Sequence, residues 1–280
     1  MRLKPWLLGI VAAGLLAAIG FSLDWAPFRT SADAQSRSAP AQPGSATGSG
    51  RGAAAEPIDQ PVPRDLIERL EKVSRAGLAQ TPHLQPGPLM RIDGAEAGSA
   101  PPLVLYIGAD YCPYCAVLRW PLALALMRFG DLDGLRYMRS SAHDVFPSTP
   151  TFSFVDAKLD SSLLELQAVE LQDRDGNALE RPDPTQRDTF VKLNPGGSIP
   201  FLDLGGKYLS VGSPFSPQPL QGLDWEQVVE ELEQGGNAAW QGIVGEANVL
   251  TAALCTLTNG QPSDVCTAPG IAAAAQRLPQ

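Results

Sequence analysis

Four cysteines carry the strongest chemical signal in the sequence, and they fall into two pairs. Cys112 and Cys115 are separated by Pro113 and Tyr114, so they lie within one turn if a helix begins there. At a helix start, exposed N–H groups and the helix dipole stabilise a thiolate on the first sulfur. Cys112 is then a nucleophile that forms a mixed disulfide, and Cys115 is placed to attack that disulfide and release the partner. This exchange is the chemistry of a dithiol oxidoreductase.

The same pair has two structural alternatives, an inert bridge or half of a zinc site completed by Cys255 and Cys266. We favour redox activity, because an exported compartment oxidises thiols and the second pair lacks the spacing of a zinc knuckle. Cys255 and Cys266, eleven positions apart, are best interpreted as a structural disulfide that pins the last segment to the final helix. A second redox relay is the alternative for that pair.

A buried strand must deliver the dithiol to the start of a helix. Residues 103–107 are all apolar, as in a strand covered on both faces, and residues 108–111 turn the chain. Apolar residues then recur at helical spacing from Leu118 to Phe129. Pro121 lies inside this predicted helix, where its missing N–H predicts a kink rather than an end.

Further elements are predicted on both sides of this unit. Pro200 begins a strand pair joined by a glycine turn, so it either lies at a sheet edge or follows a cis bond from Ile199. Predicted helices cover residues 64–79, a segment capped by Asp224, and residues 238–257; predicted strands cover residues 135–138, 151–155, 163–171, 199–204 and 207–211.

A strand, Cys-Pro-Tyr-Cys, a helix, a later Ile-Pro before a strand pair and a closing helix together resemble the thioredoxin superfamily. The longer string from Leu105 to Ala116 resembles one set more closely, the domain-of-unknown-function family 929, thioredoxin-like proteins of archaea and actinobacteria. Other matching positions are Arg119, Trp120, Arg128, Phe129, Gly130, the run Thr149–Phe154, the run Pro200–Leu202, and the ending from Ala247 through Cys255 to Cys266.

The resemblance covers residues 64–268 and implies an α/β fold, a thioredoxin-like mixed sheet flanked by helices. It also implies that Pro200 is cis and faces the dithiol. About 85 residues separate Cys115 from Pro200, more than the minimal fold needs. An insertion between the dithiol helix and the cis-proline strand, over residues 140–190, is therefore expected to shape a partner surface. The family name itself brings no activity.

The N-terminal region predicts export. Residues 5–23 form 19 positions without a charge, which as a helix reach roughly 28 Å, about one hydrocarbon thickness. Arg2 and Lys4 precede them and favour a cytoplasmic N-terminus. We therefore expect residues 1–28 to be a single-pass membrane anchor, with a cleaved signal and a secreted product as the alternative. Residues 29–63 predict a disordered Ala/Pro/Gly/Ser linker, and residues 269–280 a flexible tail.

Composition excludes other classes of function. The 21 Lys and Arg against 30 Asp and Glu give a net charge of −9, which disfavours nucleic-acid binding. The only two histidines are His83 and His143, too few for His-rich metal chemistry, and His143 receives no role. No cofactor or metal is expected.

The sequence thus predicts a membrane-tethered, extracytoplasmic thiol–disulfide oxidoreductase in which Cys112 attacks, Cys115 resolves and Pro200 lines the substrate groove. Its expected partners are protein thiols or disulfides, a redox partner, and the membrane through the N-terminal segment. The alternative is a redox-inactive thioredoxin-like binding module that uses both cysteine pairs only as structural disulfides.

Overall fold

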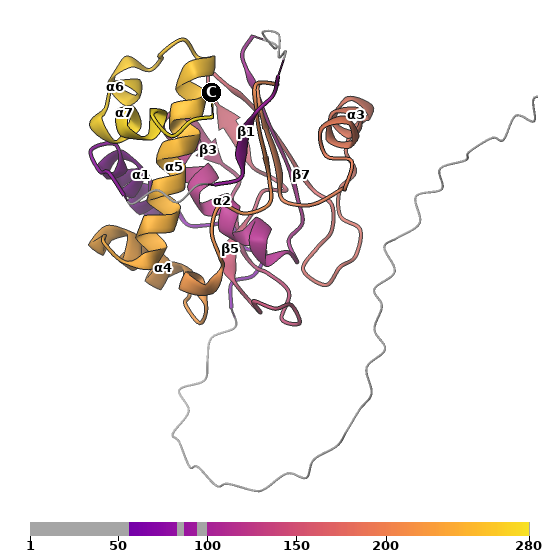
Figure 1. Ribbon diagram of the computed structural model, residues 1–280. Helices are drawn as coiled ribbons and strands as arrows, with labels where there is room; N and C mark the ends of the chain where they lie inside the picture. Colours follow the sequence, from indigo (N-terminus) through magenta and orange to yellow (C-terminus); the bar gives the residue numbers. More distant parts are fainter. Residues whose placement is uncertain (1–55, 83–86, 94–99, 280) are drawn as a thin grey trace, which may run out of the picture. The chain divides into compact units, whose positions relative to one another are not determined.

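The computed structural model describes residues 56–82, 87–93 and 100–279 (Figure 1). The predicted anchor or signal over residues 1–28, and the linker as far as residue 55, lie outside the described residues. In the part of the chain that is described, no helix is both long and apolar enough to span a bilayer.

A mixed sheet of five strands forms the centre of the fold. In order across the sheet, the strands are β1 (Leu89–Arg91), β9 (Tyr208–Val211), β8 (Phe201–Leu204), β2 (Leu103–Gly108) and β7 (Glu165–Glu170). Only β2 and β7 run parallel, and the other neighbours are antiparallel. Gly108 lies opposite Glu170 and Ile107 lies opposite Phe201, so the end of β2 is flanked by the end of β7 and the start of β8.

Two small sheets and seven α-helices complete the part of the domain that the structure describes. The small sheets pair β3 (Asp131–Asp133) with β6 (Lys158–Asp160) and β4 (Arg136–Arg139) with β5 (Pro150–Ser153). The helices of the described residues are α1 (Arg64–Gly77), α2 (Pro113–Leu126), α3 (Pro184–Leu193), α4 (Trp225–Gln234), α5 (Ala238–Leu257), α6 (Ser263–Cys266), α7 (Pro269–Ala275) and a 3-10 turn at Gln218–Leu220.

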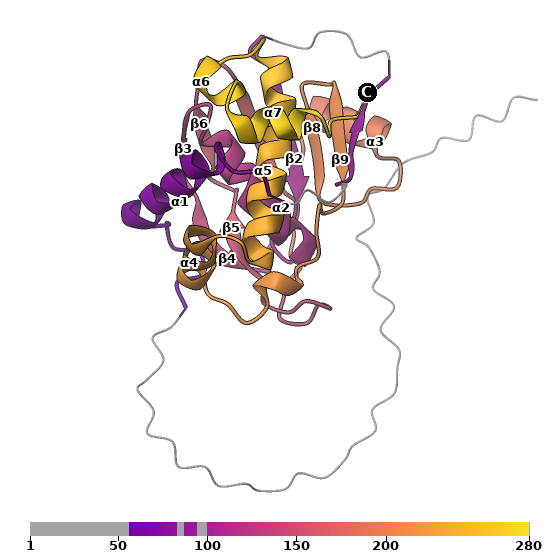
Figure 2. The ribbon, with the colours of Figure 1, turned by 60° about the vertical axis from the view of Figure 1, so that its left-hand side comes forward.

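Helices cover both faces of the sheet because strand side chains alternate between the faces. Val104 and Tyr106 of β2 point into the larger core, which includes apolar side chains of α1, α2, α4 and α5. Leu105 and Ile107 point into a smaller core that is closed by Phe190 of α3. Figures 1 and 2 show the same layering, with α3 on one side of the sheet and α5 on the other. The α/β architecture with a mixed sheet is therefore confirmed.

Two predicted boundaries are wrong. The linker was expected to continue to residue 63, but Asp59 and Val62 donate backbone hydrogen bonds to the carbonyls of Tyr137 and Leu135, each at 2.9 Å. This segment therefore joins the edge of β4. The predicted flexible tail from residue 269 is instead α7, because its small apolar face, including Ile271, is buried in the main core. Strands β1, β3 and β6 and helices α3 and α6 were not predicted, since each is short and has a weak apolar pattern.

Candidate functional site

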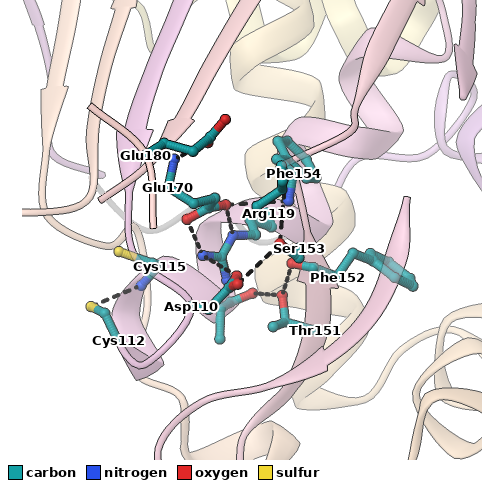
Figure 3. A network of polar contacts seen from close by, with 12 residues as sticks. Asp110, Cys112, Cys115, Arg119, Thr151, Phe152, Ser153, Phe154, Glu170 and Glu180 are labelled. Atoms are coloured by element: carbon teal, nitrogen blue, oxygen red, sulfur yellow. Dashed lines mark hydrogen bonds and ion pairs between the residues drawn. The ribbon is translucent and has the colours of Figure 1, made fainter. Parts of the chain in front are cut away.

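The dithiol lies where strand β2 passes into helix α2. Cys112 is the N-cap residue of α2, with an extended backbone, and Pro113 occupies the first helical position, where a missing N–H costs nothing. The backbone N–H of Cys115 donates to Sγ of Cys112 at 3.3 Å, so this sulfur performs the capping that an oxygen usually performs (Figure 3). The predicted helix start is confirmed, and α2 continues through Pro121 to Leu126.

The two sulfurs have different environments. Cys112 is 6% exposed, whereas Cys115 is fully buried. A hydrogen bond from the Cys115 thiol lowers the pKa of Cys112, the N–H groups of Cys115 and Tyr114 and the charge of Arg119 lower it further, and burial opposes them. Burial raises the pKa of Cys115 well above its usual value, and its hydrogen bond to Cys112 raises it further. These directions favour loss of the first proton from Cys112.

A buried ionic cluster lies beside the dithiol helix. Arg119, one turn after Cys115, donates to Glu170 through Nε at 2.8 Å and Nη2 at 2.6 Å. Its Nη2 also lies 3.3 Å from Asp110 Oδ1, and Ser153 Oγ donates to Asp110 Oδ2 at 3.1 Å. Figure 3 shows these side chains converging from α2, from the end of β7, from β5, and from the turn between β2 and α2.

Burial sets the protonation of this cluster. Desolvation raises the pKa of Glu170 to about 7 even though Arg119 opposes it, and desolvation also raises the pKa of Asp110. Burial alone would lower the pKa of Arg119, but Glu170, Tyr106 and Asp110 raise it, so the guanidinium stays charged. Within the described residues, Tyr106 Oη and Arg119 Nη1 are buried without a hydrogen-bond partner. Burial therefore raises the pKa of Glu170 beside a reactive pair, while its two hydrogen bonds from Arg119 favour the charged carboxylate.

Sequence reasoning missed this cluster. Asp110 and Arg119 belong to the residues that carry the family resemblance, but neither receives a role, and Glu170 lies inside the strand predicted over residues 163–171. The available signal was local: Arg119 follows Cys115 by four positions and thus lies on the same helical face. Nothing in the sequence pairs it with Glu170, which is 51 positions away.

Pro200 follows a cis peptide bond from Ile199, which confirms that prediction. Because β8 is antiparallel to β2 and Ile107 lies opposite Phe201, Pro200 lies at the end of the sheet where β2 leads to the dithiol. Its predicted place in a substrate groove facing Cys112 stays a prediction.

The remaining predicted residues are placed as follows. Cys255 of α5 and Cys266 of α6 form a disulfide, as predicted. Since these sulfurs are bonded to each other, the alternative zinc site that would share them with the dithiol is not formed. Among residues 56–82, 87–93 and 100–279, no group of three or more His, Cys, Asp or Glu is placed to hold a metal ion. His143 lies exposed on the loop between β4 and β5.

Residues 92–169 match the model of a family described as a domain of unknown function (DUF929). The match includes the dithiol, Asp110 and Arg119, but ends before Glu170. Neither a curated protein nor a solved structure matches this chain.

Proposed function

We propose that this protein is a thioredoxin-like thiol–disulfide oxidoreductase that acts on protein thiols. The asymmetry of the dithiol carries the proposal: Cys112 caps a helix and has a lowered pKa, while Cys115 is buried behind it with a raised pKa. An inert bridge needs no such difference, whereas a nucleophile with a resolving thiol does. Strand order β7-β2-β8-β9, with a cis proline before β8 and a closing helix α5, supports the thioredoxin-like fold.

In the direction of client reduction, the Cys112 thiolate attacks one sulfur of a client disulfide. A bond forms between Cys112 and that sulfur, and the other client sulfur leaves as a thiolate. Cys115 then loses its proton and attacks Cys112, which closes the Cys112–Cys115 disulfide and releases the first client sulfur. Two electrons pass from the protein dithiol to the client. The reverse sequence oxidises a client dithiol.

The ionic cluster modulates the second step. The charge of Arg119 favours the Cys115 thiolate and the charge of Glu170 opposes it. Burial raises the pKa of Glu170 while Arg119 opposes the rise, and protonation of Glu170 would remove that opposition to the Cys115 thiolate. Glu170 and Arg119 therefore act on the resolving thiol as positioning and electrostatic groups.

Capture of clients tests the proposal. Cys115→Ser removes the resolving attack and should accumulate mixed disulfides through Cys112 in an extract of exported proteins. Cys112→Ser should capture far less, and the variant lacking both thiols sets the background. Capture by neither single variant above that background would refute the oxidoreductase. The low exposure of both sulfurs would then favour the redox-inactive binding module.

We propose that residues 1–28 anchor the domain in the cell membrane on its extracytoplasmic side. Support comes from the uncharged segment 5–23 after Arg2 and Lys4, and from the Cys255–Cys266 disulfide, a bond typical of exported proteins. Protease should digest the domain when it is added to cells whose outer envelope is permeable and whose cell membrane is intact. Carbonate washing should leave the N-terminal segment in the membrane. Release into the medium of a shortened chain that lacks the N-terminal segment would instead indicate cleavage and secretion.

A further inference from the structure

The loop over residues 141–148, which joins β4 to β5, lies beside the dithiol. The backbone N–H of Ser141 donates to the carbonyl of Tyr111 at 2.9 Å, directly before Cys112. The ring of Phe146 meets the ring of Tyr114 edge-on, with centroids 6.0 Å apart. Since Tyr114 is one of the two residues between the cysteines, this loop forms one wall of the region around Cys112.

This wall is held in place from the other side. Arg174 lies in the turn that follows β7, and its Nε and Nη2 donate to Ser140 O at 3.3 Å and Ser148 Oγ at 3.4 Å. Both ends of the loop are thereby tied to one guanidinium. The loop is thus a braced part of the surface, with its middle facing outward.

Apolar groups are exposed in the middle of this loop. Val145 is 75% exposed, the highest value among the large exposed hydrophobic residues of the described chain, and Tyr114 is 39% exposed. Phe146, whose ring contacts that of Tyr114, is half-buried. We call Tyr114, Val145 and Phe146 the client patch. Exposed apolar side chains next to a reactive thiol favour a partner that brings apolar surface of its own.

The charges around the patch narrow the class of partner. Asp144 precedes Val145 and acts electrostatically on Tyr111, and Asp173 acts on Asp110. Asp175 follows in the same turn, so three carboxylates lie near this loop, while the guanidinium groups of Arg174 and Arg139 donate to it and offset part of their charge. A small anionic disulfide, such as that of glutathione, is repelled by this field. Cys112 is only 6% exposed, so a partner must reach it with a chain that can extend.

We propose that the client patch selects extended polypeptide segments in which an apolar side chain neighbours the reacting cysteine. The apolar side chain rests on Val145 and Tyr114 while the client sulfur meets Cys112. This inference rests on the proposed function and names its substrate class, an unfolded or locally extended protein segment without net negative charge at its cysteine.

Two disulfide-linked peptide dimers that differ only in the residue after cysteine, leucine or serine, test the proposal. The reduced protein is mixed with each dimer, the reaction is quenched by an alkylating reagent, and oxidation of Cys112 and Cys115 is followed by mass. Partial burial of one leucine predicts oxidation about tenfold faster by the leucine dimer than by the serine dimer. Glutathione disulfide should be slower than both.

Val145→Asp should bring the leucine-to-serine rate ratio close to one, and Tyr114→Ser should lower it independently. Val191→Asp is the matched control, because Val191 is an exposed valine, 57% exposed, on α3; it should leave the ratio unchanged. An equal loss of the ratio in Val191→Asp and Val145→Asp, or a wild-type ratio of one, overturns the client patch. The uncharged disulfide of mercaptoethanol distinguishes failure of the client patch from failure of the proposed oxidoreductase activity. If the peptide dimers and this small disulfide all fail to oxidise the wild-type dithiol, the oxidoreductase itself is refuted.

Discussion

The carboxyl group of Glu246 offers a direct test of the electrostatics of this core. Glu246 lies on α5, is 6% exposed, and its Oε1 has no hydrogen-bond partner among the described residues. Desolvation raises its pKa from 4.5 to about 7. Between these values, the folded protein holds a proton that the unfolded chain has released, so stability falls as the pH rises.

The structure sets the size of this effect. Each unit of pKa shift corresponds to about 1.4 kcal/mol, so a shift from 4.5 to about 7 corresponds to about 3 kcal/mol of stability lost by pH 8. Glu246→Gln keeps the shape and cannot ionise. The variant should match the wild type near pH 4.5 and exceed it by about 3 kcal/mol at pH 8.

Urea unfolding at both pH values, followed by tryptophan fluorescence, measures this difference. Other buried carboxyl groups, such as Glu170 and Asp203, are common to both proteins and cancel. Glu230→Gln makes the same chemical change at an exposed position of α4 and is the control. A stability difference between Glu246→Gln and the wild type that does not change with pH would show that Glu246 is not buried as an unpaired acid.

Three other predictions follow from the site and its supports. Glu170→Gln removes a charge that raises the pKa of Cys115, so the pKa of Cys115, followed by the ultraviolet absorbance of its thiolate, should fall. An unchanged or higher pKa would show that Glu170 does not act on the Cys115 thiol. Replacing both Cys255 and Cys266 by alanine opens a loop of sequence separation 11 and should lower the free energy of unfolding by about 3 kcal/mol. Denaturation in an oxidising buffer measures this free energy, and a value equal to that of the wild type would refute a stabilising disulfide. Arg128→Met removes a buried guanidinium that donates hydrogen bonds to α1 and α5, so it should lower the free energy of unfolding by roughly 2 to 4 kcal/mol. A thermal melting curve measures the loss, and stability near that of the wild type would contradict the prediction.

Local patterns in the sequence were enough to predict the strand and helix around the dithiol, the cis bond and the disulfide, because each depends on residues close together in the chain. The apolar run at 103–107 and the helical spacing after Cys112 placed a strand and a helix on either side of the dithiol, and both are observed. Proline after Ile199 restricts the backbone strongly enough to predict the cis bond. Cys255 and Cys266, close in sequence, were paired from their spacing and position.

Only the tertiary structure decided which distant groups share the interior. Glu170 reaches Arg119 because β7 lies parallel to β2, a pairing across 51 positions that no local pattern encodes. The alanines of residues 269–275 favour a helix, but only the packing of Ile271 and Ala274 against the main core holds this segment in place. The same holds for the loop at 141–148, whose polar ends are tied by Arg174 so that Phe146 meets Tyr114. Sequence fixes backbone preferences within a few residues, whereas desolvation and ion pairing depend on the packing of the whole chain.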